Sequence, residues 1–198
     1  VCTNRFYVHS KVMDEFVGKF SNEVKKISVG HGFHDGVKQG PLISKAGLDK
    51  VARHVEDAKS RGAEVVCGGN AVRVAGLDGE TFFEPTVISG LSTECQMYNE
   101  ETFGPVSGIL PFEEEEQVVQ MANDTDMGLA SYFYTKDLSR AFRVSEQLEY
   151  GMVGVNSGLI STEIAPFGGV KYSGMGREGS KYGIDEYVDI KYTAMEHI

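Results

Sequence analysis

Residues 106–112 read Val-Ser-Gly-Ile-Leu-Pro-Phe, an apolar run that predicts a buried strand. Four acidic residues follow it, and because negative charge favours a helix N-terminus they predict a helix next. The same order then repeats, with a strand predicted at 130–134, a helix at 138–148 and a strand at 152–156. Strands that alternate with helices predict an α/β domain with an open, largely parallel sheet flanked by helices.

The N-terminal half predicts a strand followed by two amphipathic helices. Residues 5–9 suit a short strand, and Ser10 can cap a helix that runs to about Ile27. Ser44 can cap the second helix, which ends at Gly62. Apolar residues recur on one face of this second helix at helical spacing: Leu48, Val51, Val55 and Ala58.

Two further strands are predicted before the run at 106–112. Residues 63–67 form one of them, closed by a pair of glycines, and residues 82–88 form the other. Pro85 has no backbone N–H to donate, so we expect the second strand to lie at a sheet edge or to contain a bulge.

The composition argues against several classes of protein. The 198 residues carry a net charge of −10, which is unfavourable for binding nucleic acid or a membrane surface. No apolar run is long enough to span a bilayer. The three cysteines lack a CxxC pair, so we predict neither a zinc site nor a disulfide framework. We therefore expect the protein to reside in a reducing compartment. His31 and His34 have no further ligands nearby, and we predict no metal site.

The region after residue 157 is rich in glycine and ends in an alternating segment. Residues 174–179 match the pattern GxGxxG, but they follow a loop and leave 19 residues, so we interpret them as a tight turn. Residues 187–193 predict a terminal strand. Such a strand either pairs with another domain or subunit or is an ordinary edge strand.

Two loops beside predicted strands hold candidate binding residues. One loop is residues 100–105, Glu-Glu-Thr-Phe-Gly-Pro, where a carboxylate can accept hydrogen bonds from ribose hydroxyls and the phenyl ring can flank a planar ring. Alternatively, this segment only connects a helix to a strand and its acidic pair is exposed. Residues 156–170 hold Ser161 and Phe167, which suit a pocket for an anionic group or belong to a surface loop. Cys2 is a nucleophile only beside a base or in an electropositive setting, and otherwise an inert thiol.

Three motifs together resemble the aldehyde dehydrogenase superfamily. Residues 100–106 look like its EE(I/T)FGPV motif, and residues 166–171 with Ser173 and Gly174 look like its PFGGxKxSG motif. Residues 1–5, Val-Cys-Thr-Asn-Arg, look like the end of its active-site segment GQxCxxxxR. The order and spacing of the motifs match the family over essentially the whole chain.

Residues 156–192 are similar in particular to the succinic semialdehyde dehydrogenases of this family. The resemblance implies NAD(P)-dependent oxidation of succinic semialdehyde to succinate, a step of 4-aminobutyrate degradation, through a cysteine thiohemiacetal and thioester. Those enzymes carry a Cys-x-Cys pair. The resemblance therefore implies a nucleophile immediately before Val1, and it makes Cys2 the second, redox-active thiol.

The resemblance also implies the roles of four residues. Glu101 matches the residue that binds the nicotinamide ribose, and Phe103 matches the residue that contacts the nicotinamide ring. Ser161 matches a serine that holds the distal carboxylate of the substrate, and Phe167 an aromatic residue of the substrate tunnel. The cofactor is expected to be NAD or NADP, because the residues that distinguish them belong to a part of the family fold not present in this sequence.

The resemblance implies a domain organisation as well. Residues 1–172 are expected to form the aldehyde dehydrogenase catalytic domain, and residues 173–198 a C-terminal loop and oligomerisation strand; the NAD(P)-binding domain is missing. The chain alone is then expected to be inactive. The expected partners are a small-molecule aldehyde and further copies of the same protein in a homotetramer. The resemblance implies the mitochondrial matrix for a eukaryotic protein and the cytoplasm for a bacterial one.

Other hypotheses stay open at this point. The substrate can be another semialdehyde or betaine aldehyde. The chain can also be a truncated, non-catalytic assembly subunit. In a third hypothesis, Cys2 itself is the nucleophile of a hydrolase or thiol enzyme.

Overall fold

The computed structural model describes residues 2–77 and 81–197. The described chain divides into two compact units, residues 2–118 and residues 119–197. The division falls inside helix α4 (Glu115–Asn123). The domain boundary predicted between residues 172 and 173 stays a prediction.

The N-terminal unit alternates strands with helices. Its elements are β1 (Arg5–His9), the 3-10 helix η1 (Ser10–Val12), α1 (Met13–Val24), α2 (Lys45–Ser60), β2 (Glu64–Cys67), β3 (Ala71–Val72), β4 (Phe82–Phe83), β5 (Thr86–Ser89), α3 (Gln96–Asn99) and β6 (Val106–Phe112). The main sheet has the order β1-β6-β5-β2. β6 pairs in parallel with both β1 and β5, whereas β2 pairs antiparallel to β5, so the sheet is largely parallel, as predicted.

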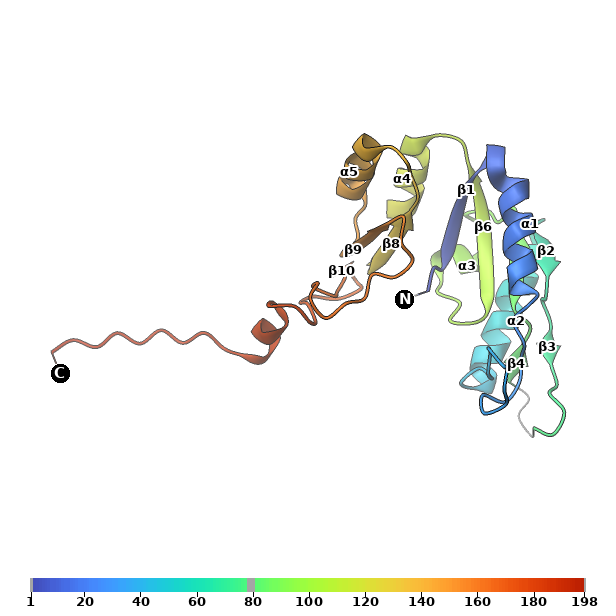
Figure 1. Ribbon diagram of the computed structural model, residues 1–198, viewed down its shortest axis with the longest axis horizontal. Helices are drawn as coiled ribbons and strands as arrows, with labels where there is room; N and C mark the ends of the chain where they lie inside the picture. Colours follow the sequence, from blue (N-terminus) through green and yellow to red (C-terminus); the bar gives the residue numbers. More distant parts are fainter. Residues whose placement is uncertain (1, 78–80, 198) are drawn as a thin grey trace. The chain divides into compact units, whose positions relative to one another are not determined.

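Helices cover both faces of this sheet. On one face, Val8, Val87 and Ile109 form a buried cluster against apolar residues of α1. On the other face, Gly108 makes room for Met97 of α3, because a Cβ atom at position 108 would lie 2.9 Å from Met97 Cε. Figure 1 shows α1 and α3 on opposite sides of β6. The predicted α/β class is therefore confirmed for this unit.

Helix α2 confirms its predicted cap and buried face. The Ser44 hydroxyl accepts a hydrogen bond from the Gly47 N–H at 3.1 Å, and the helix begins at Lys45. The four predicted inward residues are all buried. One polar residue, His54, lies among them and is 0% exposed.

Two local predictions are wrong. Ser10 does not cap α1, because its hydroxyl donates to the Phe112 carbonyl at 2.9 Å; His9 accepts from the Lys11 N–H instead, and the helix starts only after η1. The strand predicted at 82–88 is split into β4 and β5, and Pro85 lies in the break. β5 is a central strand and not an edge strand.

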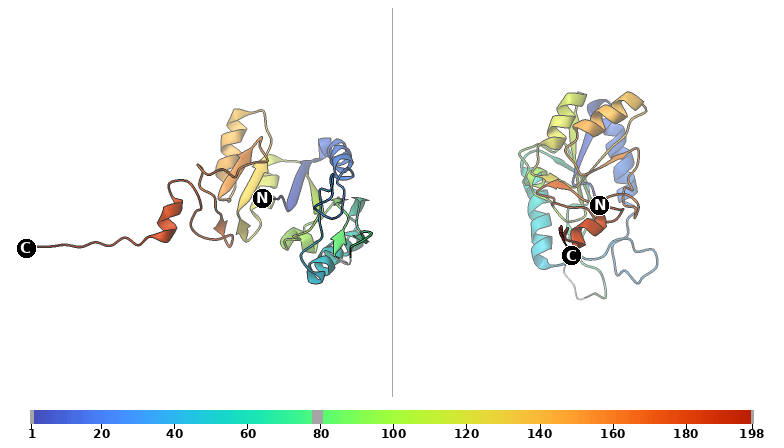
Figure 2. Two further views of the ribbon diagram at one scale, coloured as in Figure 1. Left: turned by 60° about the horizontal axis from the view of Figure 1, so that its bottom comes forward. Right: turned by 90° about the vertical axis from the view of Figure 1, so that its left-hand side faces the viewer.

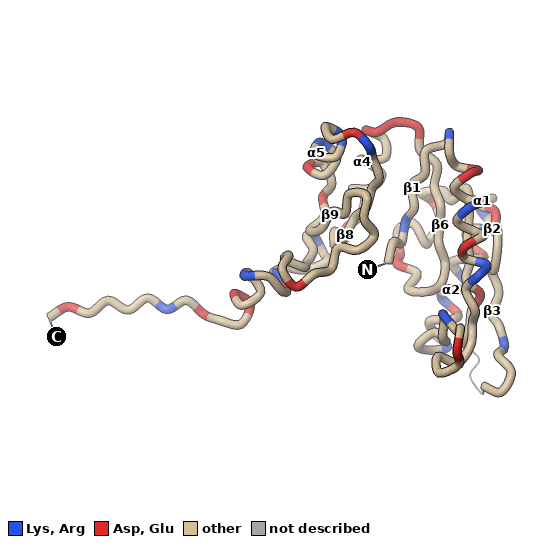
Figure 3. Tube along the Cα trace, viewed as in Figure 1, with Lys and Arg blue, Asp and Glu red and all other residues tan. Residues whose placement is uncertain are grey.

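The C-terminal unit contains the rest of the alternation. Its elements after α4 are β7 (Met127–Gly128), β8 (Ala130–Phe133), α5 (Leu138–Gln147), β9 (Met152–Val155), β10 (Val170–Lys171) and the 3-10 helix η2 (Gly183–Tyr187). β8 and β9 pair in parallel, and β10 pairs antiparallel to β7. Glu115 and Glu116 occupy the first turn of α4, within the acidic run that Figure 3 shows after β6.

The chain beyond η2 is extended. Residues 188–197 have no assigned secondary structure (Figure 1, Figure 2), and Tyr187 ends η2 and does not begin a strand. All of these residues are exposed, and the apolar Val188, Ile190 and Tyr192 stand at alternate positions among them. A strand at 187–193 that pairs with another subunit stays a prediction. No helix in the described ranges is both long and apolar enough to cross a membrane.

Candidate functional site

Residues 100–104 belong to the first candidate loop, which connects α3 to β6 and holds one buried side chain among exposed ones. Thr102 is 3% exposed, whereas Glu101 is exposed and Phe103 is 79% exposed. Thr102 is therefore the buried anchor of the loop, between the exposed residues Glu101 and Phe103. The two residues predicted to contact a cofactor are among the exposed residues of this loop.

His54 of α2 contacts two residues of this loop, Thr102 and Glu100. Its Nδ1 lies 3.1 Å from the Thr102 hydroxyl oxygen, at hydrogen-bond distance. Its Nε2 lies 3.3 Å from Glu100 Oε2, but without the alignment of a hydrogen bond, so we regard this contact as electrostatic. One imidazole therefore contacts two alternate residues of the loop.

The same helix supports both ends of the loop. Lys50 Nζ lies 3.7 Å from Glu100 Oε1. At the other end, a Cβ atom on Gly104 would lie 2.3 Å from Val51 Cγ2, so only glycine lets the backbone approach α2 this closely. Phe103, between the anchored residues, has a left-handed backbone with φ of 51°. Such a conformation persists in a non-glycine residue only where its surroundings fix it.

The N-terminal segment is tied to the same loop. The Thr102 N–H donates to Asn4 Oδ1 at 3.3 Å, and Asn4 Nδ2 donates to the Met97 carbonyl at 3.5 Å. Cys2 is exposed and its thiol is free. Val1, the neighbour of the expected nucleophile, lies outside the described residues. Asn4 therefore connects the segment that carries Cys2 to the loop that presents Glu101 and Phe103.

Two carboxylates at the base of the loop have lowered pKa values. The His54 imidazole lowers the pKa of Glu100 most, against the opposing effect of partial burial, and nearby Lys50 and Arg53 lower it further. The Gln96 backbone N–H, which donates to Asp57 Oδ2 at 2.7 Å, lowers the pKa of the Asp57 carboxyl most. Asp57 thereby joins α2 to the first residue of α3.

The second candidate loop, residues 157–169, lies in the C-terminal unit and is held through its backbone. Phe167 and Glu178 exchange two backbone hydrogen bonds of 2.9 Å and 2.7 Å, and the Ser180 N–H donates to the Glu163 carbonyl at 2.8 Å. Arg177 Nη1 donates to the Gly169 carbonyl at 2.8 Å. The residues 174–179 thus form the turn that closes this loop, in agreement with the interpretation of the GxGxxG pattern.

The side chains of the second loop differ in exposure. Ser161 is exposed, and Phe167 is half-buried beside its bridge to Glu178. A serine hydroxyl in this setting can donate to a carboxylate, and a partly buried ring can form an apolar wall.

The predicted site residues are divided between the two units. Cys2, Glu101 and Phe103 belong to the N-terminal unit, and Ser161 and Phe167 belong to the C-terminal unit. The sequence analysis missed the residues that hold these positions, chiefly Asn4, His54 and Arg177. His54 had a detectable signal, because it lies at helical spacing within an apolar face; the contacts of the other two are tertiary and have no local signal.

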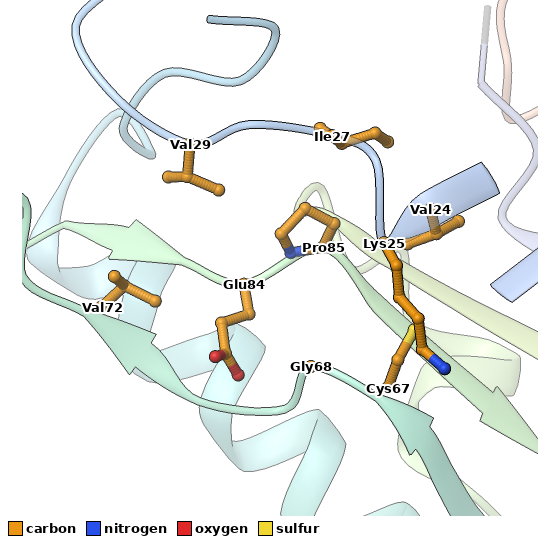
Figure 4. Close-up of a pocket in the computed structure, with 9 residues that line it drawn as sticks. All are labelled: Val24, Lys25, Ile27, Val29, Cys67, Gly68, Val72, Glu84 and Pro85. Carbon is orange, nitrogen blue, oxygen red and sulfur yellow. The ribbon is translucent and has the colours of Figure 1, made fainter. Parts of the chain in front are cut away.

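A separate groove does not contain any predicted site residue. It has a volume of about 300 Å³ and is open to solvent. Figure 4 shows the residues that line it. Its lining is largely aliphatic, with Lys25 and Glu84 as its charged residues. Within residues 2–77 and 81–197, no group of three or more potential ligands could hold a metal ion.

Comparison with known proteins identifies similar chains. The model of the aldehyde dehydrogenase family matches residues 1–193. A succinate semialdehyde dehydrogenase of Acinetobacter baylyi is 52% identical over 193 residues, which are 98% of this chain and 39% of that protein. A glutarate-semialdehyde dehydrogenase of Pseudomonas aeruginosa is 52% identical over 195 residues, 98% of this chain and 40% of that protein. The chain spans only 36% to 40% of the length of the curated relatives that it matches at about 50% identity.

Solved structures are also similar to this chain, and the names of some similar proteins include their cofactor. The crystal structure of a succinate-semialdehyde dehydrogenase from Burkholderia pseudomallei has a TM-score of 0.93 and 52% identity, and covers 98% of this chain and 39% of that one. An Escherichia coli relative, 50% identical over 97% of this chain and 39% of its own length, is named as NADP(+)-dependent. A Staphylococcus aureus betaine aldehyde dehydrogenase in complex with NAD+ has a TM-score of 0.85 and 38% identity, and covers 93% of this chain and 38% of its own. The matched relatives include bacterial and mitochondrial proteins.

Proposed function

We propose, since the chain belongs to the aldehyde dehydrogenase family, that the whole protein containing it oxidises succinic semialdehyde to succinate with NAD or NADP. The observation that carries this proposal is the loop at 100–104. It exposes a carboxylate, Glu101, and an aromatic ring, Phe103, and is anchored between them by Thr102. Relatives named for succinic semialdehyde, such as the one from Acinetobacter baylyi, support the choice of substrate.

The presented residues fit a nicotinamide nucleotide. The exposed Glu101 carboxylate has acceptor oxygens for two ribose hydroxyls, and the exposed Phe103 ring can lie against a planar ring. A bound nicotinamide supplies the acceptor for the hydride. The role of this loop is then to fix the ribose, so that the position of the ring relative to the thiol is determined by the protein.

We further place the nucleophile immediately before Val1. Its thiolate sulfur bonds to the aldehyde carbon to form a thiohemiacetal, and loss of hydride from that carbon leaves a thioester. Water then adds to the thioester and breaks the carbon–sulfur bond, which releases the carboxylic acid and the thiol. Cys2, exposed and two positions after the nucleophile, can form a reversible disulfide with it under oxidation.

The second loop is proposed to recognise the substrate. Ser161 donates its hydroxyl to the distal carboxylate of the semialdehyde, and Phe167 forms part of the wall along the carbon chain. The chain terminus at 187–193 is proposed to pair as a strand with a neighbouring subunit in a homotetramer. The exposed apolar residues Val188, Ile190 and Tyr192, which stand at alternate positions, support this proposal.

Glutaric semialdehyde is the second candidate substrate. The glutarate-semialdehyde dehydrogenase of Pseudomonas aeruginosa is as similar to the chain, at 52% identity, as the Acinetobacter protein. The two substrates differ by one methylene group, which a substrate pocket distinguishes by about 10- to 200-fold in kcat/KM.

A panel of aldehydes tests the proposal. The full-length protein is assayed for NAD(P)H formation with succinic semialdehyde, glutaric semialdehyde, betaine aldehyde and butanal. We expect the highest kcat/KM with succinic semialdehyde and the lowest with the cationic betaine aldehyde. A protein that oxidises none of the four would refute the proposed activity, and a preference for betaine aldehyde would refute the proposed substrate class.

A further inference from the structure

Helix α2 contacts the loop at 100–104 through every second residue of the loop. Lys50 and His54 approach Glu100, His54 also approaches Thr102, and Val51 packs against Gly104. The three helix residues lie on one face, because they are separated by one, three and four positions. The side chains between these contacts, at positions 101 and 103, are exposed.

His54 is an unusual choice for its position if only packing matters. Its neighbours on the buried face of α2 are aliphatic, and its side chain is 0% exposed. Burial of a polar ring is unfavourable unless its nitrogen atoms find partners, and a leucine would fill similar space without that cost. The partner that His54 finds is the hydroxyl of Thr102, 48 residues further along the chain.

Thr102 is held from two directions. Its side chain bonds to His54 at 3.1 Å, and its backbone N–H donates to Asn4 at 3.3 Å. A residue fixed at both its side chain and its backbone has little rotational freedom, so the directions of its two neighbours are fixed as well. Those neighbours are the proposed cofactor contacts, Glu101 and Phe103.

We infer that His54 is a positioning residue, which acts through Thr102 to hold Glu101 and Phe103 in the orientation that receives the nicotinamide nucleotide. The inference rests on the proposed function of this loop. His54 is buried beneath the loop and would not touch the cofactor itself. Its effect should therefore appear in cofactor binding and not in the chemistry of the aldehyde.

The partners of the ring specify its hydrogen-bonding role. The Thr102 hydroxyl can donate to Nδ1, which leaves the hydrogen on Nε2, the nitrogen that lies 3.3 Å from the Glu100 carboxylate. An asparagine at position 54 offers a polar atom near the place of Nδ1, whereas a leucine offers none. The asparagine variant should therefore retain part of the function that the leucine variant loses.

The test compares variants of the full-length enzyme with succinic semialdehyde at saturation. We expect His54→Leu and Thr102→Val each to raise the KM for NAD(P) by roughly three- to tenfold, the range of one lost hydrogen bond, with the aldehyde KM unchanged. The double variant should be no worse than the single ones, because both remove the same contact. His54→Asn should lie between the wild type and His54→Leu.

Val55→Ala is the matched control. Val55 is buried on the same face of α2, and its truncation lowers stability without removing the contact to Thr102. It should leave the cofactor KM unchanged. In hydrogen exchange on the cofactor-free protein, the Thr102 amide should exchange faster in His54→Leu than in Val55→Ala.

The outcomes separate this inference from the proposed function. If the wild type oxidises the aldehyde but His54→Leu and Thr102→Val leave the cofactor KM unchanged, His54 is a packing residue and the inference is wrong. Additive effects in the double variant would also contradict it. If the wild type binds NAD(P) but oxidises no aldehyde, the proposed function fails, while the exchange and NAD(P)-binding measurements still decide the role of His54.

Discussion

The two candidate loops are fixed in different ways. The loop at 100–104 is anchored by side chains, with Thr102 bonded to His54 and to Asn4. The loop at 157–169 is held by backbone pairs to residues 178 and 180 and by the guanidinium of Arg177. The first arrangement fixes one buried residue between the exposed Glu101 and Phe103, whereas the second fixes the path of the backbone and leaves Ser161 exposed.

The difference fits the two ligands that we propose. A nicotinamide nucleotide is the same for every aldehyde, so a loop that presents two side chains in one orientation suits it. The aldehydes named for related proteins vary in length and charge, from succinate and glutarate semialdehydes to betaine aldehyde. A loop with a fixed backbone and exposed side chains can change its specificity by substitution without loss of its path.

The largest effect is expected from Gly151→Ala, which tests the backbone packing of the second loop. A Cβ atom at position 151 would lie 2.1 Å from the Gly168 carbonyl oxygen and 2.8 Å from Gly169 Cα. Both are backbone atoms, which cannot rotate away, so we expect a loss of about 3 kcal/mol or more in the free energy of unfolding. Thermal unfolding of the full-length protein measures the loss, and a melting temperature equal to that of the wild type would contradict backbone-to-backbone packing here.

A smaller effect is expected from Gly104→Ala, which tests the side-chain packing of the first loop. The new Cβ atom would lie 2.3 Å from Val51 Cγ2, a side-chain atom that can move in part. We expect a loss of about 1–3 kcal/mol and weaker NAD(P) binding. Addition of Val51→Ala should restore NAD(P) binding, because it removes the clash. A double variant that binds no better than Gly104→Ala would show that Val51 is not what the loop packs against.

The smallest effect is expected on stability at acid pH. It tests whether the Asp57 contact between α2 and α3 supports the first loop and not the second. The Gln96 N–H and, after the opposing effect of burial, Arg61 lower the pKa of Asp57, so its contribution to stability is complete above its unfolded-state pKa of about 4. This contribution is lost as the pH falls through the lower, folded-state pKa. The difference in stability between wild type and Asp57→Asn should therefore narrow below about pH 4.

Hydrogen exchange locates this acid effect. Amides of α3 and the loop at 100–104 should lose protection in Asp57→Asn, whereas the Phe167 and Glu178 amides should not change. Asp49→Asn, a loss of charge on the exposed side of α2, is the control. Equal loss of protection in both loops would show that they are not held by separate sets of contacts.

Local patterns in the sequence predicted much of the N-terminal unit. The apolar run at 106–112 is the central strand β6, and Ser44 caps α2 as expected, because both depend on residues close in the chain. Ser10 failed as a cap because a tertiary contact to the Phe112 carbonyl competes for its hydroxyl. The terminal segment at 187–193 alternates as a strand does, but a strand needs a partner to pair with, and periodicity does not specify one.

The candidate site was predictable in its presented residues and not in its supports. Glu101 and Phe103 belong to a short motif beside a strand. Asn4 and Thr102 are 98 residues apart in the chain, and their contact exists only after the sheet has formed. His54 is the exception, since a histidine within an apolar helical face indicates a buried polar partner even before that partner is known.

The most direct test of the division between the loops is a comparison of Glu101→Gln with Ser161→Ala in the full-length enzyme. Each variant removes or weakens one hydrogen bond to a charged group, which changes affinity by about tenfold or more. We predict that Glu101→Gln raises the KM for NAD(P) and not that for succinic semialdehyde, and that Ser161→Ala does the reverse. If both variants change the same KM, or if Ser161→Ala leaves the succinic semialdehyde KM unchanged, the account of two loops with separate ligands is wrong.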